Sequence, residues 1–182
     1  MNAALRKLLQ LRAWLAPLGA HRWALTALLL IWVLAALRLF IDPSPRLPLL
    51  FNVTPSLPHH LVWLRQDGTA LRRGDLVVYR FEGESAADRP GLRGQPFFKV
   101  LRGLPGDVVT VSGLSVALNG EQMGMVKSHS FDGRALHPIA AGVIPPGHFY
   151  VQGTGPDSFD SRYRESGLVR ADQVLGTAVV LY

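Results

Sequence analysis

Hydrophobic positions follow two different patterns along the 182 residues of the chain. Residues 23–37, WALTALLLIWVLAAL, carry no charge, and passing over Arg38 extends this run through Ile41 to 19 residues. An α-helix rises about 1.5 Å per residue, so a run of this length suits a hydrocarbon core about 30 Å thick. The pattern predicts a membrane-spanning anchor over 23–41. A cleaved signal peptide and a buried core helix remain as alternatives.

After about residue 60 the pattern changes to short apolar runs separated by Gly, Pro, Asn and Asp. Such punctuation is typical of short strands joined by tight turns, with no long helical period. The sequence therefore predicts one mostly β domain over 56–182, an antiparallel sheet or barrel-like fold, with insertions or surface loops at 83–95 and 127–146. The expected strands are Leu61–Arg65, Asp75–Phe81, Pro96–Arg102, Asp107–Ser112, Ser115–Leu118, Gly147–Gln152 and Leu175–Leu181.

Between these two parts lies a proline-rich stretch. Residues 41–58 hold five prolines, which disfavour helix, so we expect an extended linker over 42–55. Upstream of the apolar run, residues 1–22 could form an interfacial amphipathic helix or a basic tail, and the sequence does not separate the two.

Charge is concentrated near the N-terminus. Residues 1–50 contain six basic residues and one acidic residue, a net +5, whereas residues 51–182 contain 13 and 12, a net +1. The positive-inside rule then predicts a cytoplasmic N-terminus, an inner-membrane anchor and a periplasmic domain in a Gram-negative cell. A nearly neutral domain argues against a nucleic-acid partner.

The sequence lacks the residues or spacings that cysteine-based and metal sites require. The absence of cysteine excludes disulfides, cysteine-ligated metals and thiol nucleophiles. Histidines are scattered, and the adjacent His59 and His60 would point to opposite faces of an extended chain. We therefore expect no metal and no cofactor.

Lysine usage singles out Lys99. The chain has three lysines against 16 arginines, and Lys99 lies on an expected strand whose same face carries Phe97 and Leu101. One interpretation is an edge-strand charge that prevents aggregation. The other is a desolvated lysine, which loses its proton readily and can act as general base for a serine hydroxyl.

Several sequence blocks resemble those of the type I signal peptidases, which are serine–lysine peptidases. FFKVLRGLPGD at 97–107 is similar to the family's lysine strand and turn, RRGDLVVYRF at 72–81 to the strand before it, and GTGPDSFDSRY at 153–163 to a block ending S-x-D-S-R. TPSLPHHLVW at 54–63 is similar to the nucleophile block, and its threonine–x–serine–x–proline pattern is closest to the TraF-type peptidases of conjugative transfer. Val100 and the GTGPD opening depart from the family's pattern.

The resemblance implies roles for the matching residues. Ser56 matches the nucleophile and Lys99 the general base, in a peptidase that uses neither metal nor cofactor. The implied supporting residues are Thr54 in the oxyanion hole, Ser158 as the hydroxyl that orients the lysine, and an ion pair of Asp160 with Arg162.

The expected function is that of a membrane-anchored serine endopeptidase. The resemblance implies that its substrate is a precursor protein, a pilin for the conjugative branch, with small residues at the first and third positions before the cut. Two alternatives remain: a general signal peptidase for secreted proteins, and a non-enzymatic β scaffold in a secretion or conjugation apparatus.

Overall fold

The computed structural model describes residues 22–41, 48–52, 54–66, 68 and 70–182. The chain separates into two compact units, residues 1–43 and 44–182. The predictions for residues 1–21 and for most of the linker before residue 48 lie outside the described residues.

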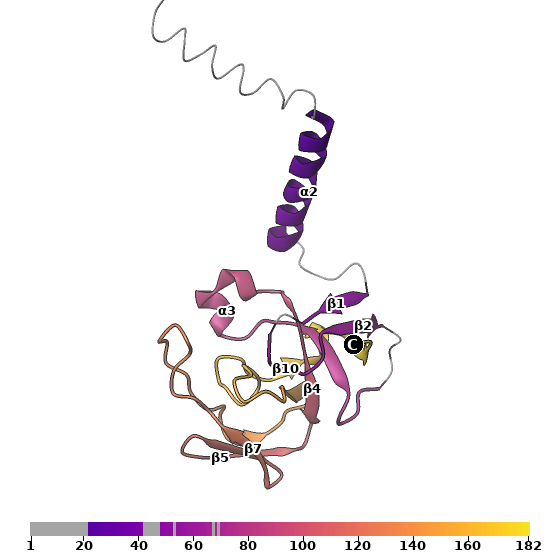
Figure 1. The fold of residues 1–182 in the computed structure, drawn as a ribbon. Helices are drawn as coiled ribbons and strands as arrows, with labels where there is room; N and C mark the ends of the chain where they lie inside the picture. The colour runs from indigo at the N-terminus through magenta and orange to yellow at the C-terminus, as the bar shows by residue number, and fades with distance from the viewer. Residues whose placement is uncertain (1–21, 42–47, 53, 67, 69) are drawn as a thin grey trace, which may run out of the picture. The chain divides into compact units, whose positions relative to one another are not determined.

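Helix α2, Arg22–Ile41, coincides with the apolar run that predicts an anchor (Figure 1). Every residue described along 22–37 is exposed, including Trp23, Leu29 and Trp32. In the part of the chain that the structure describes, no helix is both long and apolar enough to cross a membrane. The helix is therefore present, and its predicted membrane-spanning role is not confirmed.

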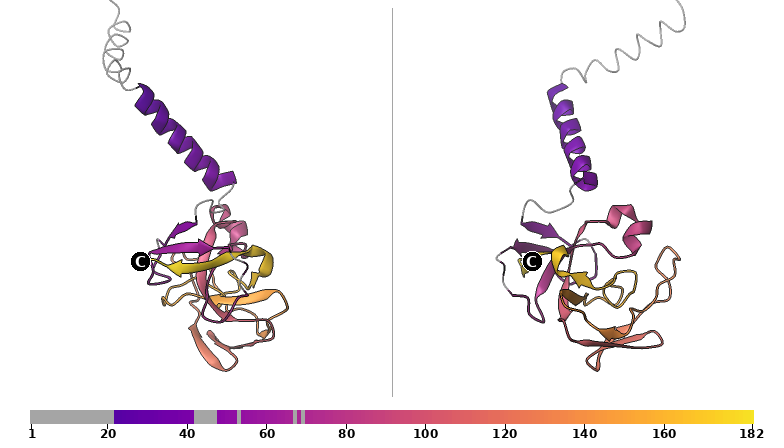
Figure 2. Two further views of the ribbon diagram at one scale, coloured as in Figure 1. Left: turned by 90° about the vertical axis from the view of Figure 1, so that its right-hand side faces the viewer. Right: turned by 180° about the vertical axis from the view of Figure 1, so that it is seen from behind.

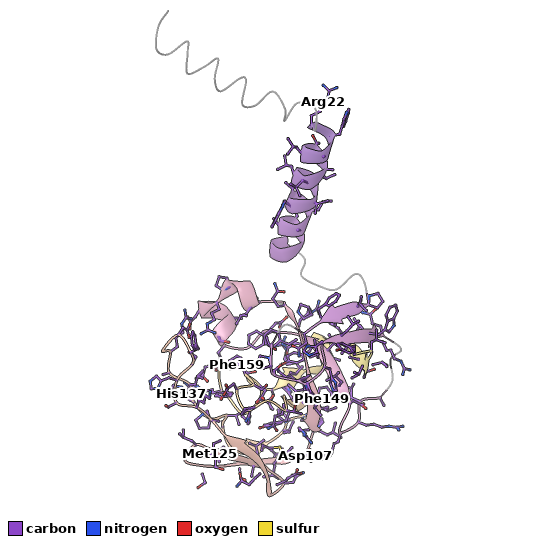
Figure 3. All side chains as sticks on the ribbon, in the orientation of Figure 1. Arg22, Asp107, Met125, His137, Phe149 and Phe159 are labelled. Carbon is purple, nitrogen blue, oxygen red and sulfur yellow. The ribbon has the colours of Figure 1, made fainter. Side chains whose placement is uncertain are left out.

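The second unit is built from two antiparallel sheets. The larger has seven strands in the order β1-β2-β11-β3-β4-β9-β10, and the smaller has four in the order β7-β6-β5-β8. The views of Figures 1 and 2 place β5 and β7 together at one end of the domain, remote from β1 and β2. Figure 3 labels Asp107 and Met125 at that end. The strands are β1 Leu49–Phe51, β2 Leu61–Arg65, β3 Leu76–Arg80, β4 Pro96–Gly103, β5 Val108–Ser112, β6 Ser115–Leu118, β7 Glu121–Met125, β8 Gly142–Val143, β9 His148–Gln152, β10 Val169–Arg170 and β11 Val174–Val180.

Alternation along the central strands divides the core. On β4, Phe97 and Leu101 pack into one cluster with β3 and β9, whereas Phe98 and Val100 pack into another with β1 and β2. The short strands of the smaller sheet bury a third cluster around Val116 and Tyr150. This is the arrangement expected when successive side chains of a strand point to opposite faces.

The mostly antiparallel β fold predicted from the sequence is confirmed, and every expected strand is present within one or two residues. Within the expected linker over 42–55, residues Leu49–Phe51 are extended as predicted, but they form β1 and pair with β2, so the sheet begins before residue 56. The segment 83–95 contains helix α3, Ser85–Asp88, and the 3-10 turn η1, Pro90–Leu92. The segment 127–146 contains β8, and the 3-10 turn η2, Ala171–Gln173, precedes β11.

Candidate active site

Ser56 lies in a closed loop at the end of the β1–β2 pair. The backbone N–H of Asn52 donates to the carbonyl of His60 at 2.9 Å, which joins the two ends of this loop. Pro55 and Pro58 flank the Ser56–Leu57 step and restrict its backbone. Leu57 anchors the loop in the core that contains Val62 and Phe98. A serine held in this way loses little entropy when it reacts.

Thr54 lies beside Ser56 as the sequence suggests. Its Oγ1 is 2.9 Å from the Oγ of Ser56, and Ser56 is 8% exposed. The N–H of Ser56 makes no hydrogen bond within the described residues. One hydroxyl and one backbone N–H are therefore near the Ser56 side chain, and these are the kinds of donor that an oxyanion hole requires.

Lys99 stands in the middle of β4 and is 5% exposed. Its strand partner on β3 is Val77, which is fully buried. Burial lowers the pKa of Lys99 from 10.5 to about 8, with Asp160 opposing this effect and Arg162 adding to it. Because β4 is a central strand of the larger sheet, the edge-strand interpretation of Lys99 is wrong.

A single cavity of about 540 Å³ brings Ser56, Thr54 and Lys99 together. Its walls also include Phe97 and Phe98 of β4. The apolar walls limit solvent around the amine, which is the physical reason for its lowered pKa.

Asp160 and Arg162 form a buried ion pair. Arg162 Nε donates to Asp160 Oδ1 at 2.9 Å and Nη2 donates to Oδ2 at 3.0 Å. The same guanidinium donates to the carbonyl of Ser158 at 3.0 Å, and Asp160 accepts the N–H of Gly153 at 3.0 Å. The predicted ion pair is present, and it holds both ends of the 153–158 loop.

The Ser158 hydroxyl differs from its predicted role. Its Oγ is buried and has no hydrogen-bond partner among the described atoms, so no bond from Ser158 to Lys99 forms in this structure. Ser158 nevertheless lies near Ser56, because a Cβ built on Gly153 would clash with both Ser158 Oγ and the Ser56 carbonyl. The N–H of Gly155 also donates to that carbonyl at 3.1 Å.

Comparisons with known proteins identify the family. Residues 20–182 match the model described as signal peptidase, peptidase S26. The chain belongs to the S26 signal peptidase family. Two conjugal transfer proteins TraF are also similar to this signal peptidase family member over 125 residues, which cover 62% of this chain and 70% of each relative. Identity is 30% for the protein from Agrobacterium fabrum (strain C58) and 29% for that from Agrobacterium tumefaciens (strain 15955).

A solved signal peptidase I from Enterococcus faecalis V583 is similar at 22% identity, covering 60% of this chain and 97% of that chain. The TM-score of this match is 0.35.

Asn52 is a residue of this signal peptidase site that sequence reasoning missed. Its side-chain amide makes four hydrogen bonds, all to the loop that carries Ser56. The signal available in the sequence was the spacing of Asn52 and Thr54, because an Asn side chain commonly accepts from the N–H two residues later.

A second cavity adjoins the first. It measures about 610 Å³ and shares Arg89, Asp157 and Phe159 with the cavity that contains Ser56. Two ion pairs lie at this boundary, Arg89 with Asp132 at 2.6 Å and Lys127 with Asp157. Charged side chains therefore lie where the two cavities meet.

Residues suited to a metal are not gathered anywhere in the described ranges. No group of three or more His, Asp or Glu side chains is placed there to hold an ion. The chemistry open to the described site is that of a hydroxyl, an amine and hydrogen-bond donors in an apolar cavity.

Proposed function

We propose that this protein is a serine endopeptidase in which Ser56 is the nucleophile and Lys99 the general base. The observation that carries the proposal is the placement of both side chains on one cavity, with burial lowering the pKa of Lys99 to about 8. A base whose pKa lies near the working pH transfers protons efficiently, and arginine could not take this role. Membership of a peptidase family supports the same chemistry.

The reaction begins when the neutral amine of Lys99 takes the proton of Ser56 as Oγ attacks the scissile carbonyl. The resulting oxyanion is stabilised by the N–H of Ser56 and the hydroxyl of Thr54. Lys99, now an ammonium, gives its proton to the leaving amine as the C–N bond breaks, and an acyl-enzyme remains on Ser56. Lys99 then accepts a proton from water, which attacks the ester and returns the Ser56 hydroxyl.

We further propose that the substrate is a precursor protein of a conjugative-transfer apparatus, a pilin in particular. The similarity to two conjugal transfer proteins TraF supports this choice over a general signal peptidase. The walls of the cavity that contains Ser56 favour a substrate with a small side chain before the cut, because Phe97 and Phe98 occupy part of the space beside Ser56 and Lys99.

Anchoring of this enzyme in the inner membrane, with the catalytic domain in the periplasm, is a proposal that rests on the sequence. The apolar run over 23–41 and the basic residues before it support this orientation. Anchoring would raise the effective concentration of a membrane-inserted precursor. Extraction with alkaline carbonate tests it: the protein should stay with the membrane pellet, and release into the supernatant would contradict the proposal.

The peptidase proposal is tested with the full chain purified in detergent. A quenched fluorescent peptide, with alanine at the first and third positions before the cut, should be cleaved by the wild type. Ser56→Ala and Lys99→Arg should both lose cleavage, the second because charge is kept while the base is lost. Arg102→Lys, which exchanges the same two residue types at an exposed position of β4 outside this cavity, is the matched control and should retain the rate.

Retained cleavage in Ser56→Ala or Lys99→Arg would contradict the assignment of the dyad. Circular dichroism of each variant checks that the domain is folded before its rate is read. Incubation with pilin precursor and with a secreted preprotein of the same cell then tests the substrate class: processing of both at similar rates would favour the general signal peptidase.

A further inference from the structure

The side chain of Asn52 connects both halves of the loop that carries Ser56. Its Nδ2 donates to the carbonyls of Leu57 at 3.1 Å and His59 at 3.0 Å. Its Oδ1 accepts the backbone N–H of Thr54 at 3.1 Å and the hydroxyl of Thr54 at 2.9 Å. One half-buried amide thus makes contacts before and after the nucleophile.

These contacts determine which way the amide faces. Carbonyl oxygens only accept hydrogen bonds, so the NH₂ group must face Leu57 and His59. A backbone N–H only donates, so the amide oxygen must face Thr54. Turning the amide over would place oxygen against two carbonyls and leave the N–H of Thr54 facing a donor.

The amide orientation in turn assigns the hydroxyl protons. A threonine hydroxyl has one proton, and that of Thr54 is donated to Asn52 Oδ1. The 2.9 Å contact between Thr54 Oγ1 and Ser56 Oγ must then have Ser56 as its donor. The hydrogen bonds run in one direction, from Ser56 through Thr54 to Asn52.

We propose that Asn52 is a positioning residue that sets the direction of this hydrogen-bond chain and thereby holds the Ser56 hydroxyl in a resting orientation. In the free enzyme the Ser56 proton points to Thr54, and it turns to Lys99 when the substrate carbonyl arrives. The Thr54 hydroxyl then turns its proton from Asn52 Oδ1 to the oxyanion. Asn52 Oδ1 still accepts the hydrogen bond from the backbone N–H of Thr54. This proposal rests on the peptidase function proposed above.

The test measures acylation of Ser56 in the full chain in detergent, using an alanine-ending peptide p-nitrophenyl ester. The burst amplitude counts competent sites, and the burst rate constant reports how fast each one reacts. Asn52→Ala should lower the rate constant by about 100-fold, the effect of misplacing a reacting group by about 1 Å. The burst amplitude should stay near one per chain, since every chain keeps a competent site. If Asn52 only stabilised the fold, its loss would instead lower the amplitude and leave the rate constant unchanged.

Two variants sharpen the assignment to Asn52. Asn52→Ser keeps a short acceptor for Thr54 and should recover part of the rate. Thr54→Ala combined with Asn52→Ala should lose less than the product of the two single losses, because part of the Asn52 effect passes through Thr54.

Asn119→Gly is the matched control. Asn119 also makes two side-chain hydrogen bonds in a turn, to Asp107 and Val108, and its φ of 51° is one that glycine adopts freely. This variant should keep the wild-type burst rate constant even if its thermal stability falls.

An unchanged rate constant in Asn52→Ala, or single losses that multiply in the double variant, would overturn the positioning role alone. A wild type that gives no burst, or a burst that persists in Ser56→Ala, would overturn the peptidase proposal together with it. The two failures are therefore distinguishable.

Discussion

Lys99 lies directly opposite Val77 in the β3–β4 ladder, and both side chains are buried. The amine therefore has a methyl-bearing partner across the strands, where a carboxylate would have stabilised its charged form. Asp160 is the acid that raises the pKa of Lys99, and its effect is smaller than that of burial. The lowered pKa of Lys99 follows from the strand register, because moving β4 by one residue would turn Lys99 to the other face of the sheet.

The pH dependence of cleavage follows from this pairing. Only the neutral amine accepts a proton, so kcat/KM should rise with pH, pass through its midpoint near the Lys99 pKa of about 8, and then level off. Initial rates measured between pH 6 and pH 10 at low peptide concentration give this curve directly. A flat profile, or a midpoint near the ordinary lysine value, would contradict the desolvated base.

The free energy of unfolding should also depend on pH because of Lys99, and the direction of the change follows from its pKa. The folded-state pKa of Lys99 lies below its unfolded value of 10.5, so the unfolded chain binds more protons between pH 8 and 10.5. The free energy of unfolding of the wild type should therefore rise with pH across this window, and burial of Lys99 should destabilise the fold most below pH 8.

Lys99→Met removes that penalty while keeping a similar volume. It should abolish cleavage and raise the free energy of unfolding at pH 7 by up to about 3 kcal/mol, which corresponds to moving a pKa from 10.5 to about 8. Urea denaturation of both chains at pH 7 and pH 10.5 measures the effect. Equal stability of both chains at pH 7 would show that the lysine is solvated.

The sequence predicted seven strands, β2 to β6, β9 and β11, and the orientation of Lys99, because these follow from an alternation that is visible locally. It did not predict β1, β7, β8 or β10. In β1, a run of three apolar residues between prolines forms a strand only when β2 is present to pair with it. It also placed Ser158 as a partner of Lys99, whereas the side chain points into a buried space without a partner. The contacts of Asn52 are to backbone carbonyls, which have no signature in the sequence beyond the spacing to Thr54.

The buried pair of Asp160 and Arg162 should act on the base as well as on the fold. Asp160 raises the pKa of Lys99 and Arg162 lowers it, so Asp160→Asn should move the midpoint of the kcat/KM profile to lower pH. The same change leaves Arg162 buried without its counter-charge, and loss of one partner of such a pair costs about 3–5 kcal/mol.

Asp107→Asn is the control for that variant. Asp107 pairs with Arg73 away from the cavity that contains Lys99, so its loss should lower stability without moving the pH midpoint. A shift of the midpoint in Asp107→Asn, or an upward shift in Asp160→Asn, would argue against a direct electrostatic effect of Asp160 on the lysine.

Gly153 is where the loop held by the ion pair approaches the nucleophile, and the space there is closed. A Cβ at this position would lie 2.5 Å from the carbonyl oxygen of Ser56 and would also overlap the side chain of Ser158. Gly153→Ala must therefore push the Ser56 backbone or the 153–158 loop aside, and we expect kcat to fall by about 100-fold with a stability loss of about 1–3 kcal/mol.

Gly91→Ala is the matched change, because a Cβ at Gly91 meets no atom within 4 Å and its backbone needs no positive φ. That variant should keep the wild-type kcat and gain up to about 1 kcal/mol from the smaller entropy of its unfolded chain. Steady-state kinetics and thermal unfolding of the two alanine variants, side by side, separate displacement of the nucleophile from the general effect of adding a methyl group. If both variants cleaved at the wild-type rate, the contact between Gly153 and Ser56 would have no part in placing the nucleophile.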